Sequence, residues 1–514
     1  MKRKGIIMLI VALCIALFAS AALAVDVNDL PGLKSAIEAG GDIKLTAPIA
    51  VDAQINVQQD IVLDLAGHTI SASLGGSDVF IVSNGASMTI EDSVGNGIIS
   101  SSDDCGIQVQ GNLTGEGEAL NSKLILNNGI IEADFYPVSV MGNGAQFDIN
   151  GGIVRVTAVD GYAVSGSSGS AGYHGTIINI NGGELVGGSG LESDNPDYAG
   201  SGRDYIAGAG VFHSQDGVLN MTGGKVSGYV GIQFRSGTLN MTGGTVISNG
   251  DMPNPVASSN GAVAIGAGIA FITNGDPEKV GYRGNMSATI SGNAQVIATG
   301  EGSYAIYEGN HETAGNEIDN TQMLGLEIAG GTFEGVAGAL SLQNKGDENN
   351  EQGKITISGG SFSSEPDVKY LAEDVVFVND GEGHFVVPSL TFKTNALSLA
   401  VNDTATLEYT VVPATATLTW SSSKPECASI NATTGEITAL AIGETVITAV
   451  IDEHEATSAT CTVTVTEEEV PPTPPVTSDD VKPQPSGSGG GGCSAGFGVL
   501  ALLAALPLLR MRKK

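Results

Sequence analysis

Two arginines are the side chains of this 514-residue chain best suited to acid–base chemistry. Arg203 stands in the motif Arg-Asp-Tyr, and Arg235 directly follows Phe234 in an apolar run. An arginine beside carboxylates that hold a cation could remove a proton from an acidic sugar. Hydrolysis of a glycosidic bond instead needs two carboxylates at a fixed separation. The acids around these arginines match neither arrangement, so we treat both as candidate groove residues and assign no catalytic residue.

Acidic pairs at Asp103-Asp104 and within Asp194–Asp197 could bind calcium through their oxygens. A solvated loop is the competing explanation, and no other cofactor is predicted. His68 is expected to fill a turn, and His174 lies in a Tyr-His-Gly sequence that resembles part of a pectinase signature without its acids. The sequence has no Cys-x-x-Cys pair or histidine cluster, so a zinc site is not predicted.

Two of the five cysteines could form a disulfide. Cys427 and Cys461 lie in the same predicted domain, and an exported protein can oxidise them. Two separate buried thiols are the alternative. No disulfide partner for Cys105 is evident in the sequence.

Acidic residues dominate the charge, with 56 Asp and Glu against 22 Lys and Arg and a formal net charge of −34. Such a surface repels phosphates, so nucleic acid is excluded as a partner. The 73 glycines and the low aromatic content of 5% favour a turn-rich β protein with a narrow aliphatic core.

The elements that must position these side chains repeat along the chain. Leu-Asn-Met-Thr-Gly-Gly occurs at Leu219–Gly224 and at Leu239–Gly244, and the copies start 20 residues apart. Related units, with alternating apolar residues before Gly-Gly or Asn-Gly, extend from Leu63 to Gly360. Alternation predicts short strands and glycine predicts sharp turns, so the period predicts stacked coils of three strands.

The steps between the glycine turns are unequal. The step of 41 residues from Gly182 to Gly223 would fit two coils. Other irregular steps predict loops inserted at Gly187–Ser201, Gly250–Asn260 and His311–Leu324.

Both ends of the stack have predicted caps. An amphipathic helix at Asp29–Ala39 should cover the first coil, and a short helix and strands between Asp367 and Val387 should close the last. With the segment Leu63–Ile70 and the Gly-Gly coils, they resemble the right-handed parallel β-helix of the pectin-lyase-like superfamily over residues 25–388. That superfamily includes lyases, glycosidases and adhesins, so the resemblance implies a fold and leaves the function open.

The coils can also be aligned on a second set of strand-like segments, one strand earlier in each coil. This alignment predicts a column of Phe234, Phe271 and Tyr307. A ladder of aromatic residues inside the β-helix is the favoured interpretation. A strip that binds sugars on the outside is the alternative.

Residues 389–466 lack the repeat and contain seven strand-like runs, which predicts a β-sandwich. Leu418-Thr-Trp-Ser-Ser-Ser423 and Gly443–Ala449 resemble the group 2 bacterial immunoglobulin-like domain, and the single tryptophan, Trp420, lies in its Trp-Ser-Ser signature. The resemblance implies a spacer or adhesive module.

The two termini carry targeting patterns. Residues 1–24 have the layout of a secretory signal peptide, with cleavage predicted after Ala24. Residues 467–492 predict a flexible linker rich in Pro, Ser and Gly. Residues 493–514 combine a short apolar helix with a basic tail. Together with Gly491, Gly492 and Cys493 they resemble the GlyGly-type sorting signals of Synergistetes. That resemblance implies a sorting protease of the envelope, and a plain tail anchor is the alternative.

These observations predict an exported protein at the cell envelope or cell surface, anchored in the membrane at least transiently by the C-terminal helix. Adhesion or glycan binding, on a host or neighbouring cell, is the predicted function. The alternative is a lyase or glycoside hydrolase acting on an acidic polysaccharide.

Overall fold

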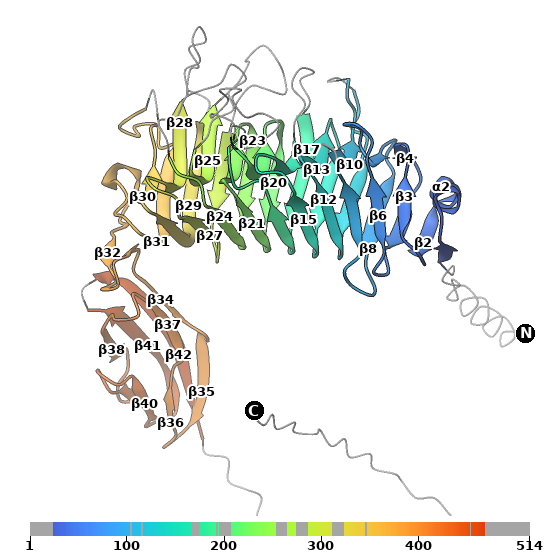
Figure 1. Ribbon diagram of the computed structural model, residues 1–514. Helices are drawn as coiled ribbons and strands as arrows, with labels where there is room; N and C mark the ends of the chain where they lie inside the picture. The colour runs from blue at the N-terminus through green and yellow to red at the C-terminus, as the bar shows by residue number, and fades with distance from the viewer. Residues whose placement is uncertain are drawn as a thin grey trace, which may run out of the picture. The chain divides into compact units, whose positions relative to one another are not determined.

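The computed structural model describes residues 24–102, 105–114, 117–166, 174–191, 194, 207–252, 265–273, 286–310, 323–344, 347–452 and 454–467. Almost all of their regular structure is β-strand. Two separate hydrophobic cores contain most of the buried residues, one within 27–370 and one within 390–465. The predicted fold class, a parallel β-helix followed by an immunoglobulin-like sandwich, is confirmed (Figure 1).

Each regular coil contributes one strand to each of three parallel arrays, named here the first ladder, the second ladder and the third sheet. The first ladder contains β1 (Val25–Val27), β2 (Gly41–Leu45), β5 (Ile61–Asp64), β8 (Ser87–Glu91), β11 (Lys123–Leu126), β14 (Gln146–Ile149), β17 (His174–Ile180), β20 (Asp216–Met221), β23 (Gly237–Met241), β26 (Met286–Ile290), β29 (Met323–Gly335) and β31 (Ile355–Phe362). The second ladder contains β3 (Ile49–Val51), β6 (Thr69–Ala72), β9 (Ile98–Ser101), β12 (Ile130–Ala133), β15 (Ile153–Val156), β18 (Glu184–Val186), β21 (Lys225–Gly228), β24 (Thr245–Ser248) and β27 (Gln295–Ala298), and it continues into the ends of β29 and β31.

The third sheet has ten strands within the described residues. They are β4 (Ile55–Val57), β7 (Phe80–Val82), β10 (Cys105–Gln110), β13 (Tyr136–Met141), β16 (Tyr162–Ser165), β19 (Ala209–His213), β22 (Val230–Phe234), β25 (Ala267–Thr273), β28 (Tyr304–Asn310) and β30 (Gly338–Ser341). Figure 1 shows the coils following one another from α2 and β2 at the blue end to β30 and β31.

Strand alternation decides what fills the interior. In β14, Phe147 and Ile149 point inward and are fully buried, whereas Gln146 and Asp148 point outward. The next coil repeats the pattern in register, because Phe147 pairs with Ile178 and Ile149 with Ile180. Burial of each such side chain stabilises the fold by about 1.5–3 kcal/mol.

The paired glycines mark the corner between the first and second ladders for two separate reasons. A Cβ atom on Gly182 would lie 2.2 Å from the carbonyl oxygen of Asn150 in the preceding coil, closer than real Cβ contacts allow. Gly183 has a φ of +70°, which residues with a side chain rarely adopt. Close approach therefore explains the first glycine, and backbone conformation explains the second.

The caps agree with their predictions. Helix α2 (Leu30–Ala39) begins where Asp29 Oδ1 accepts the N–H of Gly32 at 2.8 Å, and it buries Leu33 and Ile37. At the other end, η4 (Val368–Tyr370) is followed by β32 (Val378–Asn379) and β33 (Phe385–Val386). Strand β33 pairs antiparallel with β31, which ends the parallel stack.

The predicted meaning of the 41-residue step is wrong. Strand β17 pairs directly with β20, and β18 pairs with β21, so one coil carries an insertion where two coils were expected. Strands β18, β24 and β28 end at Val186, Ser248 and Asn310, close to where loops were predicted. Most of those loop residues lie outside the described part of the chain.

The second core belongs to β34 (Ser389–Phe392), β35 (Ala396–Ala400), β36 (Thr404–Thr406), β37 (Tyr409–Val412), β38 (Leu418–Ser422), β39 (Ala428–Ile430), β40 (Glu436–Ala439), β41 (Gly443–Ile451) and β42 (His454–Thr466). Most of these strands pair antiparallel, while β35 joins β42 in parallel. Trp420 is buried and stacks on Phe392 with 5.6 Å between ring centroids. The signature tryptophan is therefore a core residue.

Candidate functional site: two outer faces of the β-helix

Only one of the two candidate arginines lies within the described residues. Arg203 lies outside the described residues. Arg235 directly follows β22 and is 5% exposed, and its Cζ atom lies 5.3 Å from the centroid of the Phe212 ring. A guanidinium over an aromatic face is held by a cation–π contact. Arg235 is therefore a packed side chain and is not presented to a substrate in solution.

Phe212 belongs to an aromatic cluster on the outer side of the third sheet. Its ring stacks on Tyr162 with 4.7 Å between centroids and 13° between planes, and Phe135 and Tyr136 pack against the edge of this pair. Phe212 and Tyr162 are buried although they point away from the interior column of the β-helix. Leu191 and Met252, from segments that come after strands of the second ladder, pack on the same cluster.

The predicted aromatic column is correct for two of its three members. Phe234 pairs with Phe271, and both lie in the interior core with no exposed surface. Tyr307 pairs with Ala270, one position away from Phe271, so its side chain joins the outer cluster. A shift of one residue changes the face because strand side chains alternate.

Glu308 takes the interior position opposite Phe271. It is buried, and its Oε2 accepts the backbone N–H of Asn344 at 2.7 Å. Burial raises the pKa of this carboxyl although the hydrogen bonds from Asn344 and Gln343 lower it. The acid thus replaces an aromatic residue at the end of the column.

Asp194, one of the predicted calcium ligands, and the nearby Tyr229 have structural roles. Asp194 Oδ2 accepts the N–H of Leu191 at 3.0 Å, whereas Asp103, Asp104 and Asp197 lie outside the described residues. Tyr229 donates its hydroxyl to the carbonyl oxygen of Asp251 at 3.0 Å, and burial together with the nearby Asp251 and Asp194 carboxylates raises its pKa to about 12. Among the residues that the structure describes, no group of three or more His, Cys, Asp or Glu could hold a metal ion.

The two other histidine candidates lie apart. His68 follows the turn at Ala66-Gly67, where its backbone N–H donates to the carbonyl oxygen of Leu65 at 2.8 Å. His174 begins β17 opposite Asp216. They belong to different coils, so they do not share one site.

The outer face of the first ladder has a different construction. Asn240 Nδ2 donates to Asn220 Oδ1 at 2.9 Å, Asn220 donates to Asn179 at 2.8 Å, and Asn179 donates to Asp148 at 2.6 Å. Lys123 closes this row with an ion pair of 2.6 Å to Asp148. The side-chain amides therefore link neighbouring coils outside the backbone ladder.

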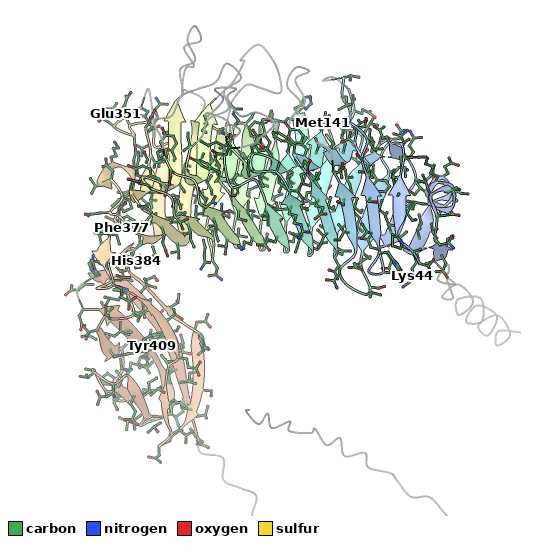
Figure 2. The ribbon with its side chains drawn as sticks, in the orientation of Figure 1. Lys44, Met141, Glu351, Phe377, His384 and Tyr409 are labelled. Carbon is green, nitrogen blue, oxygen red and sulfur yellow. The ribbon has the colours of Figure 1, made fainter. Side chains whose placement is uncertain are left out.

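A parallel row lies at the strand ends. Asn181 donates to Asn150 at 3.0 Å, Asn150 donates to Asn127 at 2.8 Å, and Thr222 Oγ1 donates to Asn181 at 3.1 Å. Lys44, labelled in Figure 2 on the same ladder, instead contacts Asp64 at 3.0 Å. Amides and hydroxyls thus occupy the middle of this face, and ion pairs occur towards its N-terminal end.

The middle of the first ladder carries few charged side chains within the described residues. Apart from His174 and the exposed Asp216 at the starts of β17 and β20, the strands β17, β20, β23 and β26 and the residue directly after each present twelve outward positions, which are exposed or half-buried. Most of these residues carry an amide or a hydroxyl, and none is charged or aromatic. They are Ile177, Asn179, Asn181, Val218, Asn220, Thr222, Thr238, Asn240, Thr242, Ser287, Thr289 and Ser291. We call this array the neutral face.

The neutral face can donate and accept hydrogen bonds without attracting ions, which suits an uncharged polyhydroxyl ligand. None of these twelve residues is among the candidates predicted from the sequence. The signal was present in the repeat, because Asn and Thr recur at the outward positions of both copies of Leu-Asn-Met-Thr-Gly-Gly.

The predicted Cys427–Cys461 bridge is absent, and both residues are buried free thiols. Cys427 Sγ contacts the carbonyl oxygen of Ala441, just before β41, while Cys461 pairs with Ile447 further along that strand. The four residue-to-residue steps from Gly443 to Ile447 span about 13 Å of strand. A disulfide requires Cα atoms about 4.4–6.8 Å apart, so the alternative of two separate thiols is correct.

Comparison with known proteins identifies one part of the chain. Residues 386–463 match the family model of the bacterial Ig-like domain (group 2). This confirms the resemblance drawn from the Trp-Ser-Ser signature. No curated protein matches the chain. Among the described residues, no helix is both long and apolar enough to cross a membrane, and the predicted C-terminal helix lies outside them.

Proposed function

We propose that this protein is an exported surface protein, anchored in the envelope, whose β-helix binds uncharged glycans through the neutral face. The observation that carries the proposal is an uncharged array of amides and hydroxyls on a chain of net charge −34. Acidic polysaccharides would be repelled by the rest of the surface, whereas neutral sugars would meet mostly hydrogen-bonding groups on the neutral face.

Export and anchoring rest on the terminal sequences and on the neighbouring domain. The predicted signal peptide ends at Ala24, and Val25 is the first residue of β1, so cleavage there would leave the β-helix complete. The group 2 Ig-like domain supports a role as a spacer. The sorting protease of the envelope is the proposed partner at Gly491, Gly492 and Cys493. Mass spectrometry of both termini of the protein from native cells tests these assignments.

One substitution on each ladder tests the glycan proposal. Thr289 and Gln295 are exposed residues of the same coil, on the first and second ladders respectively. Thr289→Asp puts one negative charge on the neutral face, and Gln295→Glu puts the same charge beside it. Binding of purified Val25–Thr466 is measured on immobilised neutral glucans, mannans and galactans and on uronate polymers.

We expect binding to a neutral polysaccharide that Thr289→Asp weakens about tenfold and Gln295→Glu leaves unchanged, since a buried unpaired charge costs more than about 1 kcal/mol at a contact. Equal effects of the two variants on glycan affinity would show that the glycan does not bind at the neutral face. Absence of binding to every neutral polymer would contradict the proposal.

The alternative enzyme acting on an acidic polysaccharide lacks a supporting geometry in the described residues. Arg235 would have to leave Phe212 to reach a substrate. Incubation with uronate polymers, followed by ultraviolet detection of unsaturated product, is the decisive assay for that activity.

A further inference from the structure

One corner of the β-helix contains buried polar side chains with atoms that lack partners within the described part of the chain. They are Thr176, His213, Ser214, Gln215 and Ser236, each at most 3% exposed, and we call them the polar corner. The side-chain atoms concerned are Thr176 Oγ1, His213 Nε2, Ser214 Oγ, both amide atoms of Gln215 and Ser236 Oγ. Each such atom costs about 1–3 kcal/mol if it stays unsatisfied.

An irregular turn brings these residues together. His213 pairs with Phe234, and Val218 pairs with Thr238. Four residues therefore lie between His213 and Val218, whereas three lie between the paired positions of the next coil. The register of β17 against β20 also shifts, between His174 and Thr176. The extra residue leaves Ser214 and Gln215 inside the corner, beside neighbouring coils about 4.8 Å away.

The contacts of His213 define the chemistry of the corner. Its Nδ1 lies 3.0 Å from the carbonyl oxygen of Ser236, and its ring stacks on Phe234 at 4.7 Å. A carbonyl oxygen only accepts, so Nδ1 carries the proton and Nε2 of the neutral ring is an acceptor. Gln215 adds a second acceptor and an N–H₂ donor, and the three hydroxyls can act in either direction.

We infer that the polar corner is a binding site for ordered water. The ligand must donate to His213 Nε2 and to Gln215 Oε1, and it must also accept from the Gln215 amide. A cation cannot accept from that amide, and a sugar is too large for residues that are nearly free of exposure. Buried water typically makes about three hydrogen bonds, so about two molecules would satisfy the six atoms.

The first test is a crystal structure of the full-length protein at a resolution that shows bound solvent. We expect density within hydrogen-bond distance of His213 Nε2 and Gln215 Oε1, with at least one water shared between two of the six atoms. Empty density would overturn the proposal. So would a cation with short contacts to several oxygens.

The second test uses near-isosteric apolar variants in the full-length chain. If water fills the corner, Gln215→Leu and Thr176→Val remove partners of that water, and each should lower the folding equilibrium constant about tenfold in urea denaturation. If the corner is dry, each variant removes an unsatisfied atom and raises the constant. A rise for either variant contradicts the proposal. Gln295→Leu, at an exposed position, is the control and should change the constant less than about twofold.

Discussion

The outer faces of the first ladder and of the third sheet differ although the same coils build both. Strands of the first ladder such as β14 alternate between buried and half-buried residues, whereas all five residues of β19 and of β22 are buried. Tight glycine turns come directly after the first ladder, while residues such as Leu191 and Met252 pack over the outer side of the third sheet. The segments that connect the strands, as well as the strands themselves, thus decide whether an outer face meets solvent.

The largest expected effect comes from truncating the covered face. Phe212→Ala should lower the free energy of unfolding by about 3–4 kcal/mol, because it opens a cavity beside Tyr162 and removes the contact with Arg235. Thr289→Ala on the neutral face should change it by less than about 0.5 kcal/mol. Denaturant unfolding measures both, and similar values would remove the distinction between the two faces.

Acidification should act through His213, the last residue of β19 in the third sheet. Burial lowers the pKa of His213 from 6.5 to about 4, so between these values the unfolded chain binds more protons than the folded one. Its contribution is present above pH 6.5 and is lost as pH falls to about 4, by up to about 3 kcal/mol. Unfolding midpoints at pH 7.5, 5.5 and 4 should show the loss.

His213→Gln is the control for this pH dependence. It keeps a polar side chain without a group that titrates in this range, so the component assigned to His213 should disappear from the pH profile. An unchanged profile would assign the effect to other groups.

Asp78 should act in the opposite direction. It immediately precedes Val79 and β7, opposite Cys105, and burial raises its pKa from 3.8 to about 6 although a hydrogen bond with Cys105 lowers it. The folded chain then binds more protons between these values, so stability present below pH 3.8 is lost as pH rises through 6. Asp78→Asn should therefore stabilise the fold by about 2 kcal/mol at pH 7.5 and by little at pH 3.5. Equal gains at both values would show that ionisation is not the cause.

The smallest effect is expected on the neutral face. Asn220→Ala removes the bonds to Asn179 and Asn240 and should destabilise by about 1 kcal/mol, because solvent replaces both partners. Hydrogen exchange of the β20 and β23 amides gives a local measurement. A cost near that of Phe212→Ala would show that the amide row contributes as much as apolar packing.

Turns and helix caps could be predicted from the sequence, whereas the pairing of distant strands could not. Gly182 and Gly183 identify a corner because close approach and positive φ both exclude side chains, and Asp29 and Gly40 bound the cap helix by local hydrogen bonding. Tyr307 was predicted on the wrong face because a column in the third sheet depends on pairing between distant strands, and a shift of one residue in that pairing reverses the face. The prediction of two coils between Gly182 and Gly223 was wrong for the same reason. The number of residues between two turns does not distinguish a second coil from a loop inserted into one coil.

The sequence by itself determined the parallel coils, the caps and the immunoglobulin-like module, because these depend on alternation, turn residues and short signatures within one unit. Only the tertiary structure decided that Arg235 is packed on Phe212, that Cys427 and Cys461 are separate thiols, and that a neutral face and a polar corner exist. These features depend on the register between coils and on burial from segments distant in sequence. Local sequence propensities predict neither the register between coils nor the burial by distant segments.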